Sequence, residues 1–188
     1  MGSILFLGLI TVILVYFILI YNNLVAIKNN VAKAWANIDV LLKQRHDELP
    51  KLVDTCKQYM KHEQETLEKV ISARSRVADA RETHNIAALG AAESALRAGL
   101  GNLFALVESY PELKANEQFL HLQARITGLE NAIADRREFY NESANINNVR
   151  IEQFPDLIVA RMFHFPPQTM LRFETADLQD VNIAKQFA

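Results

Sequence analysis

The sequence is poor in the residues that build most catalytic and metal sites, beginning with cysteine. Cys56 is the one cysteine in 188 residues, which excludes both an intramolecular disulfide and a zinc site of four cysteines. The net charge of -2 provides no excess of basic residues to attract nucleic acid. We therefore expect no nucleic-acid partner and a fold that does not depend on an oxidising compartment.

Motifs of the common enzyme classes are missing as well. His62 and Glu63 resemble the start of a metalloprotease motif, but Thr66 stands where the second histidine is needed. A helical di-metal site needs glutamate–histidine pairs on two helices, and only Glu117 with His121 comes near. There is no glycine-rich phosphate loop and no Gly-x-Ser-x-Gly turn. We predict no catalytic residue, cofactor or metal.

One long apolar segment dominates the N-terminus. Residues 4–21 carry no charge, and fourteen of these eighteen residues are Ile, Leu, Val or Phe. As a helix they span about 27 Å, close to the hydrocarbon thickness of a bilayer. A cleaved signal peptide is less favoured, because it needs basic residues at its start and a small-x-small cleavage site. The sequence predicts a transmembrane helix over residues 4–21 that is retained.

The distribution of basic residues predicts the orientation of this helix. Lys28, Lys33, Lys43 and Arg45 follow the segment, whereas residues 1–3 carry no side-chain charge. Positive charge near the end of a span favours the cytoplasmic side. We expect a short extracytoplasmic N-terminus and a cytoplasmic body.

The rest of the chain predicts an all-α fold, with the transmembrane helix continuing into an antiparallel, coiled-coil-like bundle of four long helices. No flexible linker follows the apolar segment, and apolar residues recur at steps of three and four from Ile27 to Val77. Pro50 should break that pattern into helices over 4–48 and 50–81, because it lacks a backbone donor.

A turn at 83–85 and Tyr110-Pro111 should delimit a third helix over 86–109. The fourth helix should begin after the capping residue Asn116 and extend to about residue 151. We expect a bundle over 22–154 and a phenylalanine-rich tail with a short helix over 155–188.

Polar residues interrupt the apolar lines of these helices. Arg45, Glu63 and Arg74 do so before residue 81, and Arg136 and Asn147 do so on the last long helix. Buried charges must be paired, so we expect a structural polar network. Its candidate members are the charged residues Asp39, Arg45, Glu63, Arg74, Glu108, Glu130 and Arg136. Either it specifies the bundle or it forms a binding determinant.

The tail provides candidate contacts for assembly. Five of the ten phenylalanines lie in residues 151–188, and exposed apolar segments normally mark interaction surfaces. The candidates for contact with a second copy are Phe154, Phe163, Phe165 and Phe173. The alternative is that the tail folds back on its own bundle.

Several segments together resemble the LemA family of bacterial membrane-anchored helical proteins. They include Ala34-Trp35 with Ile38-Asp39, Gln44-Arg45-His46-Asp47-Glu48-Leu49-Pro50, Glu108-Ser109-Tyr110-Pro111 and Phe139-Tyr140-Asn141. The chain departs from that family at Ile146-Asn147, where a second Tyr-Asn is usual, and at His164, where glycine is usual. The resemblance implies a body in the cytoplasm and an anchor in the bacterial inner membrane, with no established activity and no catalytic residues to carry over.

The sequence is compatible with two functions. We favour a non-enzymatic scaffold or assembly module that self-associates on the lipid bilayer, with cytoplasmic protein partners as a further possibility. The alternative is a membrane-bound ligand-binding or enzymatic domain with a polar pocket between helices. Convergent charged groups in a pocket open to solvent would favour the alternative.

Overall fold

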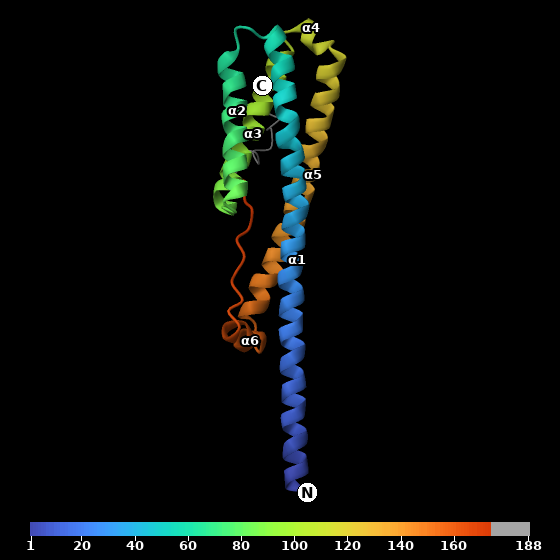
Figure 1. The fold of residues 1–188 in the computed structure, drawn as a ribbon, viewed down its shortest axis with the longest axis vertical. Helices are drawn as coiled ribbons and strands as arrows, with labels where there is room; N and C mark the ends of the chain where they lie inside the picture. The colour runs from blue at the N-terminus through green and yellow to red at the C-terminus, as the bar shows by residue number, and fades with distance from the viewer. Residues whose placement is uncertain (174–188) are drawn as a thin grey trace, which may run out of the picture. The chain divides into compact units, whose positions relative to one another are not determined.

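The computed structural model describes residues 1–173, which form an all-α structure without strands in that range (Figure 1). Two helices are long, two are intermediate in length and two are short. Their bounds are α1 Gly2–Tyr59, α2 Gln64–Glu82, α3 Ile86–Val107, α4 Pro111–Lys114, α5 Glu117–Glu152 and α6 Asp156–Met162. Part of the expected tail, residues 174–188, lies outside the described residues.

The described chain divides into two compact units. The first unit comprises residues 1–41 and 131–170, and therefore contains the start of α1, the end of α5 and α6. The second unit comprises residues 42–130 together with 171–173 of the described tail, and contains the end of α1, α2, α3, α4 and the start of α5. Each unit has its own buried apolar residues.

The first helix is longer than the sequence predicts. α1 passes through Pro50 and ends only at Tyr59, so the expected break before residue 50 is wrong. The interruption comes instead at residues 60–63, between α1 and α2. A proline inside a helix removes one donor, which leaves the carbonyl four residues earlier without its usual partner.

That carbonyl belongs to His46, and a side chain of α2 supplies the missing donor. Arg74 Nε donates to the His46 carbonyl oxygen at 2.9 Å. A second nitrogen of the same guanidinium lies 2.7 Å from His46 Nε2. Because arginine can only donate, Nε2 must accept and the ring must be neutral. Burial and the Arg74 charge lower the pKa of His46, which favours this neutral form.

Capping residues fix the turns of the second unit. Asn85 accepts from the Ala88 N–H at 3.0 Å and so caps α3. Asn116 accepts from the Phe119 N–H at 2.9 Å at the start of α5, as the sequence predicts. The expected turn at 83–85 is confirmed, and α2 and α3 lie side by side after it (Figure 1). Their apolar residues are buried, including Leu67, Val70, Leu89, Leu96 and Leu103.

In the first unit, α1 changes from an exposed helix to a packed one within a few residues. The apolar side chains from Ile4 to Leu19 are mostly exposed, whereas Ile20 and Leu24 are buried. These two residues share a core cluster with Ile151, Val159 and Ala160 of α5 and α6. Among the described helices, α1 alone is long and apolar enough to cross a membrane.

The tail returns along α5 in the first unit. Asn147 donates to the Pro166 carbonyl at 3.2 Å, and Asn148 donates to the Gln168 carbonyl at 2.9 Å. Gln168 N–H donates back to the Asn148 side chain at 2.7 Å. Asn147 therefore interrupts the apolar line of α5 because it holds the tail backbone.

The conformation of His164, the second residue after α6, shows why glycine suits that position of the LemA pattern. His164 has φ 55°, a left-handed conformation that glycine adopts at lower cost. Phe165 N–H bonds the Ala160 carbonyl and His164 N–H bonds the Arg161 carbonyl, which together make a Schellman cap. This position therefore favours glycine, and His164 adopts its conformation there at a cost in free energy.

The role of Arg74 can be tested with Pro50. Arg74→Leu should lower the free energy of unfolding by about 1–3 kcal/mol, since a partly buried carbonyl loses its donor. Pro50→Ala restores the N–H inside α1, so Arg74→Leu should cost less in that background. Urea unfolding of the four proteins measures this coupling, with the exposed Arg76→Leu as a control. An equal cost in both backgrounds would contradict the substitute-donor role.

Candidate functional site: a buried charge network

A buried arginine lies at the centre of the second unit. Arg45 of α1 is 1% exposed, and its guanidinium forms ion pairs with Glu93 of α3 and Glu130 of α5. Glu93 is 3% exposed, whereas Glu130 is partly accessible. Arg97 Nε of α3 lies 3.5 Å from the second oxygen of Glu130. The network thus joins three helices.

Local sequence explains how α3 brings Glu93 to this site. Its small residues permit close packing on α2, where a Cβ on Gly99 would lie 3.5 Å from a Val70 methyl group. Leu89 and Leu96, four residues before and three after Glu93, are both buried. Glu93 consequently occupies the buried stripe of α3.

The sequence prediction missed Glu93 although the signal was present. A lone carboxylate on an apolar line is the same kind of signal that identified Arg45. The apolar line of α3 steps from Leu89 to Leu96 and passes through Glu93. Of the predicted network, the structure brings together Arg45 and Glu130, and it adds Glu93 and Arg97.

The charges of this network depend on one another. Burial acts against the charge on Arg45, but Glu93 and Glu130 outweigh it and raise the pKa of the guanidinium. Burial raises the pKa of Glu93, although Arg45 acts in the opposite direction. An isolated buried carboxylate would be costly to keep ionised, so Arg45 is what allows Glu93 to remain charged.

The other predicted network residues of the second unit lie elsewhere. Arg74 bonds His46, as described above. Glu63 accepts a hydrogen bond from the Tyr110 hydroxyl at 3.2 Å, between the start of α2 and the turn before α4. Glu108 forms an exposed ion pair with Lys114. These residues make local contacts in place of one continuous network.

The two predicted members in the first unit, Asp39 and Arg136, lie on different helices. Asp39 is half-buried on α1. Arg136 is exposed on α5, so its expected place on the buried line is wrong. The buried stripe of α5 runs through Ile133, Tyr140 and Ala144, and at the intervening step it is Arg137 that is half-buried.

The candidate assembly phenylalanines mostly contact their own chain. In the first unit, the Phe163 ring lies 4.7 Å from the Tyr21 ring, and the Phe165 ring lies 6.0 Å from it. In the second unit, Phe173 lies under the Arg97 guanidinium at 5.4 Å. Phe154 alone of the four is largely exposed, at 81%. The described tail therefore folds back on the same molecule.

Close approach of the tail in the second unit depends on a glycine of α3. A Cβ on Gly90 would collide with the carbonyl oxygen of Arg172. Leu171, next to it, is buried. The Ala/Gly-rich half of α3 thus receives the tail backbone as well as α2.

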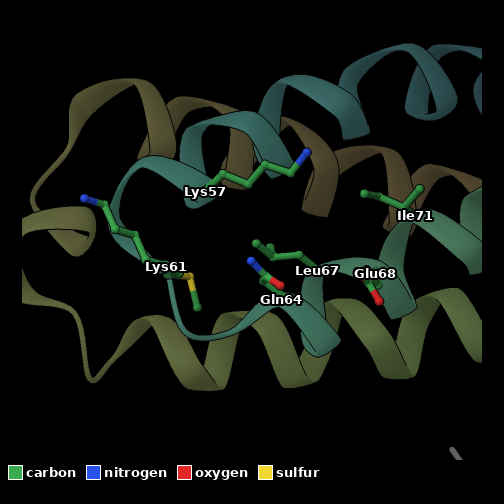
Figure 2. A pocket seen from close by; sticks show the side chains of 7 residues that line it. Lys57, Lys61, Gln64, Leu67, Glu68 and Ile71 are labelled. Atoms are coloured by element: carbon green, nitrogen blue, oxygen red, sulfur yellow. The ribbon is translucent and has the colours of Figure 1, made fainter.

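The described residues also form surface hollows outside this network. A surface hollow of about 570 Å³ is lined by residues near the end of α1 and the start of α2, including Lys57, Lys61, Gln64 and Glu68. Figure 2 shows the two lysine side chains pointing away from each other. In residues 1–173 no three His, Cys, Asp or Glu side chains are grouped to hold a metal.

Removal of Arg45 should have a pH-dependent cost. Arg45→Met should lower the free energy of unfolding by roughly 3–5 kcal/mol at pH 7, because Glu93 is left buried and charged. Without Arg45 the folded-state pKa of Glu93 lies further above its unfolded value, so this variant gains stability relative to the parent as pH falls. The deficit should therefore shrink between pH 7 and pH 5.

Urea unfolding of parent and variant at both pH values measures this deficit. Lys43→Met, an exposed basic residue on the same helix, is the matched control and should show no such trend. A deficit that is unchanged at pH 5, or absent at pH 7, would show that Glu93 does not depend on Arg45.

Comparisons with known proteins identify sequence relatives of this chain. The LemA family model matches residues 34–184. Protein LemA of Metamycoplasma hominis is 27% identical over 179 residues, which cover 93% of this chain and 79% of that protein. Magnetosome protein MamQ of Magnetospirillum gryphiswaldense is 35% identical over 68 residues, 36% of this chain.

Magnetosome protein MamQ 1 of Paramagnetospirillum magneticum gives the same identity over the same length. These matches span only 25% of the length of the MamQ proteins. The family model, in contrast, covers well over half of the 188 residues, including the whole charge network. The chain belongs to the LemA family.

Proposed function

We propose that this chain is a non-enzymatic, single-pass membrane protein whose helical body self-associates at the bacterial inner membrane as a scaffold or assembly module. The observation that carries the proposal is the continuity of α1, which runs from an exposed apolar segment into a packed core without a linker. Ile20 and Leu24 are already core residues. The first unit is therefore attached directly to its anchor.

The exposure of the anchor supports insertion into lipid. Apolar side chains from Ile4 to Leu19 would cost free energy in water, and no described segment covers most of them. A core helix of a soluble protein would be buried instead. In a bilayer these residues meet hydrocarbon and the helix satisfies its own backbone.

The orientation follows from the basic residues after the anchor. Lys28, Lys33 and Lys43 are exposed on α1. They favour a cytoplasmic body and an N-terminus on the outer side.

The charge network favours a structural role over a catalytic one. Glu93 and Glu130 both pair with Arg45, and both Arg45 and Glu93 are buried. The hollow in Figure 2 has charged side chains that point apart. The alternative of a membrane-bound enzyme or ligand-binding domain needs convergent polar groups that a ligand can reach.

A face of the first unit suits contact with a second copy. Phe139 and Ile146 of α5 are half exposed, and with Ile27 of α1 they line an apolar groove of about 330 Å³. Lys33 and Glu142 line the same groove and carry opposite charges. Two copies related by a two-fold axis could pair Lys33 of each with Glu142 of the other.

Confinement to the membrane would strengthen such a contact. Anchored copies meet in two dimensions, which raises their effective concentration for each other. A weak apolar face can therefore support assembly that would not persist in dilute solution.

A single charge in the groove should separate assembled from single copies. Ile146→Glu would bury a carboxylate at the contact, so particles extracted with their lipid should fall to one copy. Leu120→Glu is the matched control, because Leu120 on the same helix is exposed to 46% against 47% for Ile146. Mass photometry of parent and both variants counts the copies. A parent with one copy per particle, or equal effects of the two variants, would refute self-association through this face.

A further inference from the structure

We infer that α6 and its flanking turns form an interfacial foot that lies in the surface of the bilayer beside the anchor. Four apolar side chains of the foot are exposed: Phe154, Ile158, Met162 and Phe163. The inference rests on the proposed membrane anchoring of α1. It assigns the partner of this surface as lipid and not as a second protein.

The foot meets α1 at the end of the uncharged segment. The Phe163 ring lies 6.2 Å from the Phe17 ring and 4.7 Å from the Tyr21 ring. Phe17 and Tyr21 belong to the last turn of the uncharged segment 4–21. Four residues of helix rise about 6 Å, and an interfacial helix buries its apolar face about 5–10 Å into the headgroup boundary. The foot thus lies at the depth of the interface.

α6 has a buried side and an exposed apolar side. Asp156, Val159 and Ala160 are buried against the first unit. Ile158 and Met162, spaced by about one helical turn, are 54% and 52% exposed, and Phe154, in the turn between α5 and α6, is 81% exposed. Such a row of exposed large apolar residues is unusual in water, whereas an amphipathic helix in the interface requires it.

Polar and basic side chains surround the foot. Arg150 Nη2 lies 3.2 Å from the buried Asp156 carboxylate and donates to Asn23 at 3.3 Å, just beyond the uncharged segment. Arg161 and His164 are exposed on or directly after α6. Basic side chains at headgroup level are attracted to anionic lipid. Charge and apolar surface are therefore both placed as a bilayer surface requires.

The foot packs against the end of the α1 segment that is assigned to lipid. Ile20 and Leu24 of α1 are covered by Val159 and Ala160, so α6 replaces lipid on one side of α1 at the end of the span. Its own outward side then faces whatever surrounds α1 at that level. For an inserted α1, that surrounding is the bilayer interface.

Nitroxide labels can measure this environment in the full chain reconstituted in vesicles of phosphatidylcholine and phosphatidylglycerol. Single cysteines replace Ile158 and Met162. Two controls bracket them: Leu14→Cys inside the proposed span, and Val40→Cys, which replaces a residue 55% exposed on the same helix. Burial raises the pKa of Cys56 to about 12, so the native thiol should stay almost unlabelled.

The environment of each label, lipid or water, is measured from its collisions with two reagents. Oxygen enters lipid, whereas a water-soluble nickel chelate does not. The labels at 158 and 162 should prefer oxygen, at a depth shallower than the label at 14, while the label at 40 prefers nickel. If the labels at 158 and 162 prefer nickel as the label at 40 does, while the label at 14 still prefers oxygen, the lipid contact of the foot is refuted. Membrane anchoring of α1 would then stand.

Two other results have different meanings. Labels at 158 and 162 that are shielded from both reagents would show a protein-covered face, and would overturn the assignment to lipid in favour of a second copy. A label at 14 that prefers nickel would refute membrane anchoring itself, and with it the foot.

Discussion

The second unit is organised around the charge on Arg45. A guanidinium that is 1% exposed cannot be left unpaired, so α3 and α5 must present Glu93 and Glu130 to it in one register. A shift of any of the three helices by one residue would leave a buried ion without its partner. Apolar packing alone tolerates such shifts more easily, because one leucine replaces another at modest cost. The ion pairs therefore select among the packings that the apolar residues permit.

A second arginine extends this constraint to the course of α1. Arg74 replaces the donor that Pro50 lacks, and α1 can then continue to Tyr59 and carry Arg45 in the middle of an unbroken helix. At the other end, the same helix passes directly from exposed apolar residues to the core residues Ile20 and Leu24. One continuous helix thus carries both the anchor and the buried polar contacts. Side chains of α2, α3 and α5 supply the partners in these contacts.

Much of the helical pattern could be predicted because it depends on local signals. Periodicity gave α3 and most of α5, and Asn85 and Asn116 marked the starts of these helices. The course through Pro50 could not be predicted, since the substitute donor comes from a residue 24 positions later. Arg136 was predicted on the buried side of α5, but the helix phase differs by one residue from the prediction. Arg137 is therefore half-buried and Arg136 is exposed. The contacts of Phe163 and Phe173 depend on where the tail returns, which no local pattern encodes.

The central claim is that Arg45 and Glu93 depend on each other, and a double-mutant cycle tests it most directly. Arg45→Met, Glu93→Met and the double variant are compared with the parent by urea unfolding in the same detergent at pH 7. Arg45→Met leaves Glu93 buried without its ion-pair partner, and Glu93→Met leaves Arg45 with Glu130 as its remaining partner. The double change removes both the Arg45 and the Glu93 charge. The account predicts that the double variant is more stable than the sum of the single losses implies, by about 1–3 kcal/mol. Losses that add within about 0.5 kcal/mol would contradict the claim, since independent sites behave in that way.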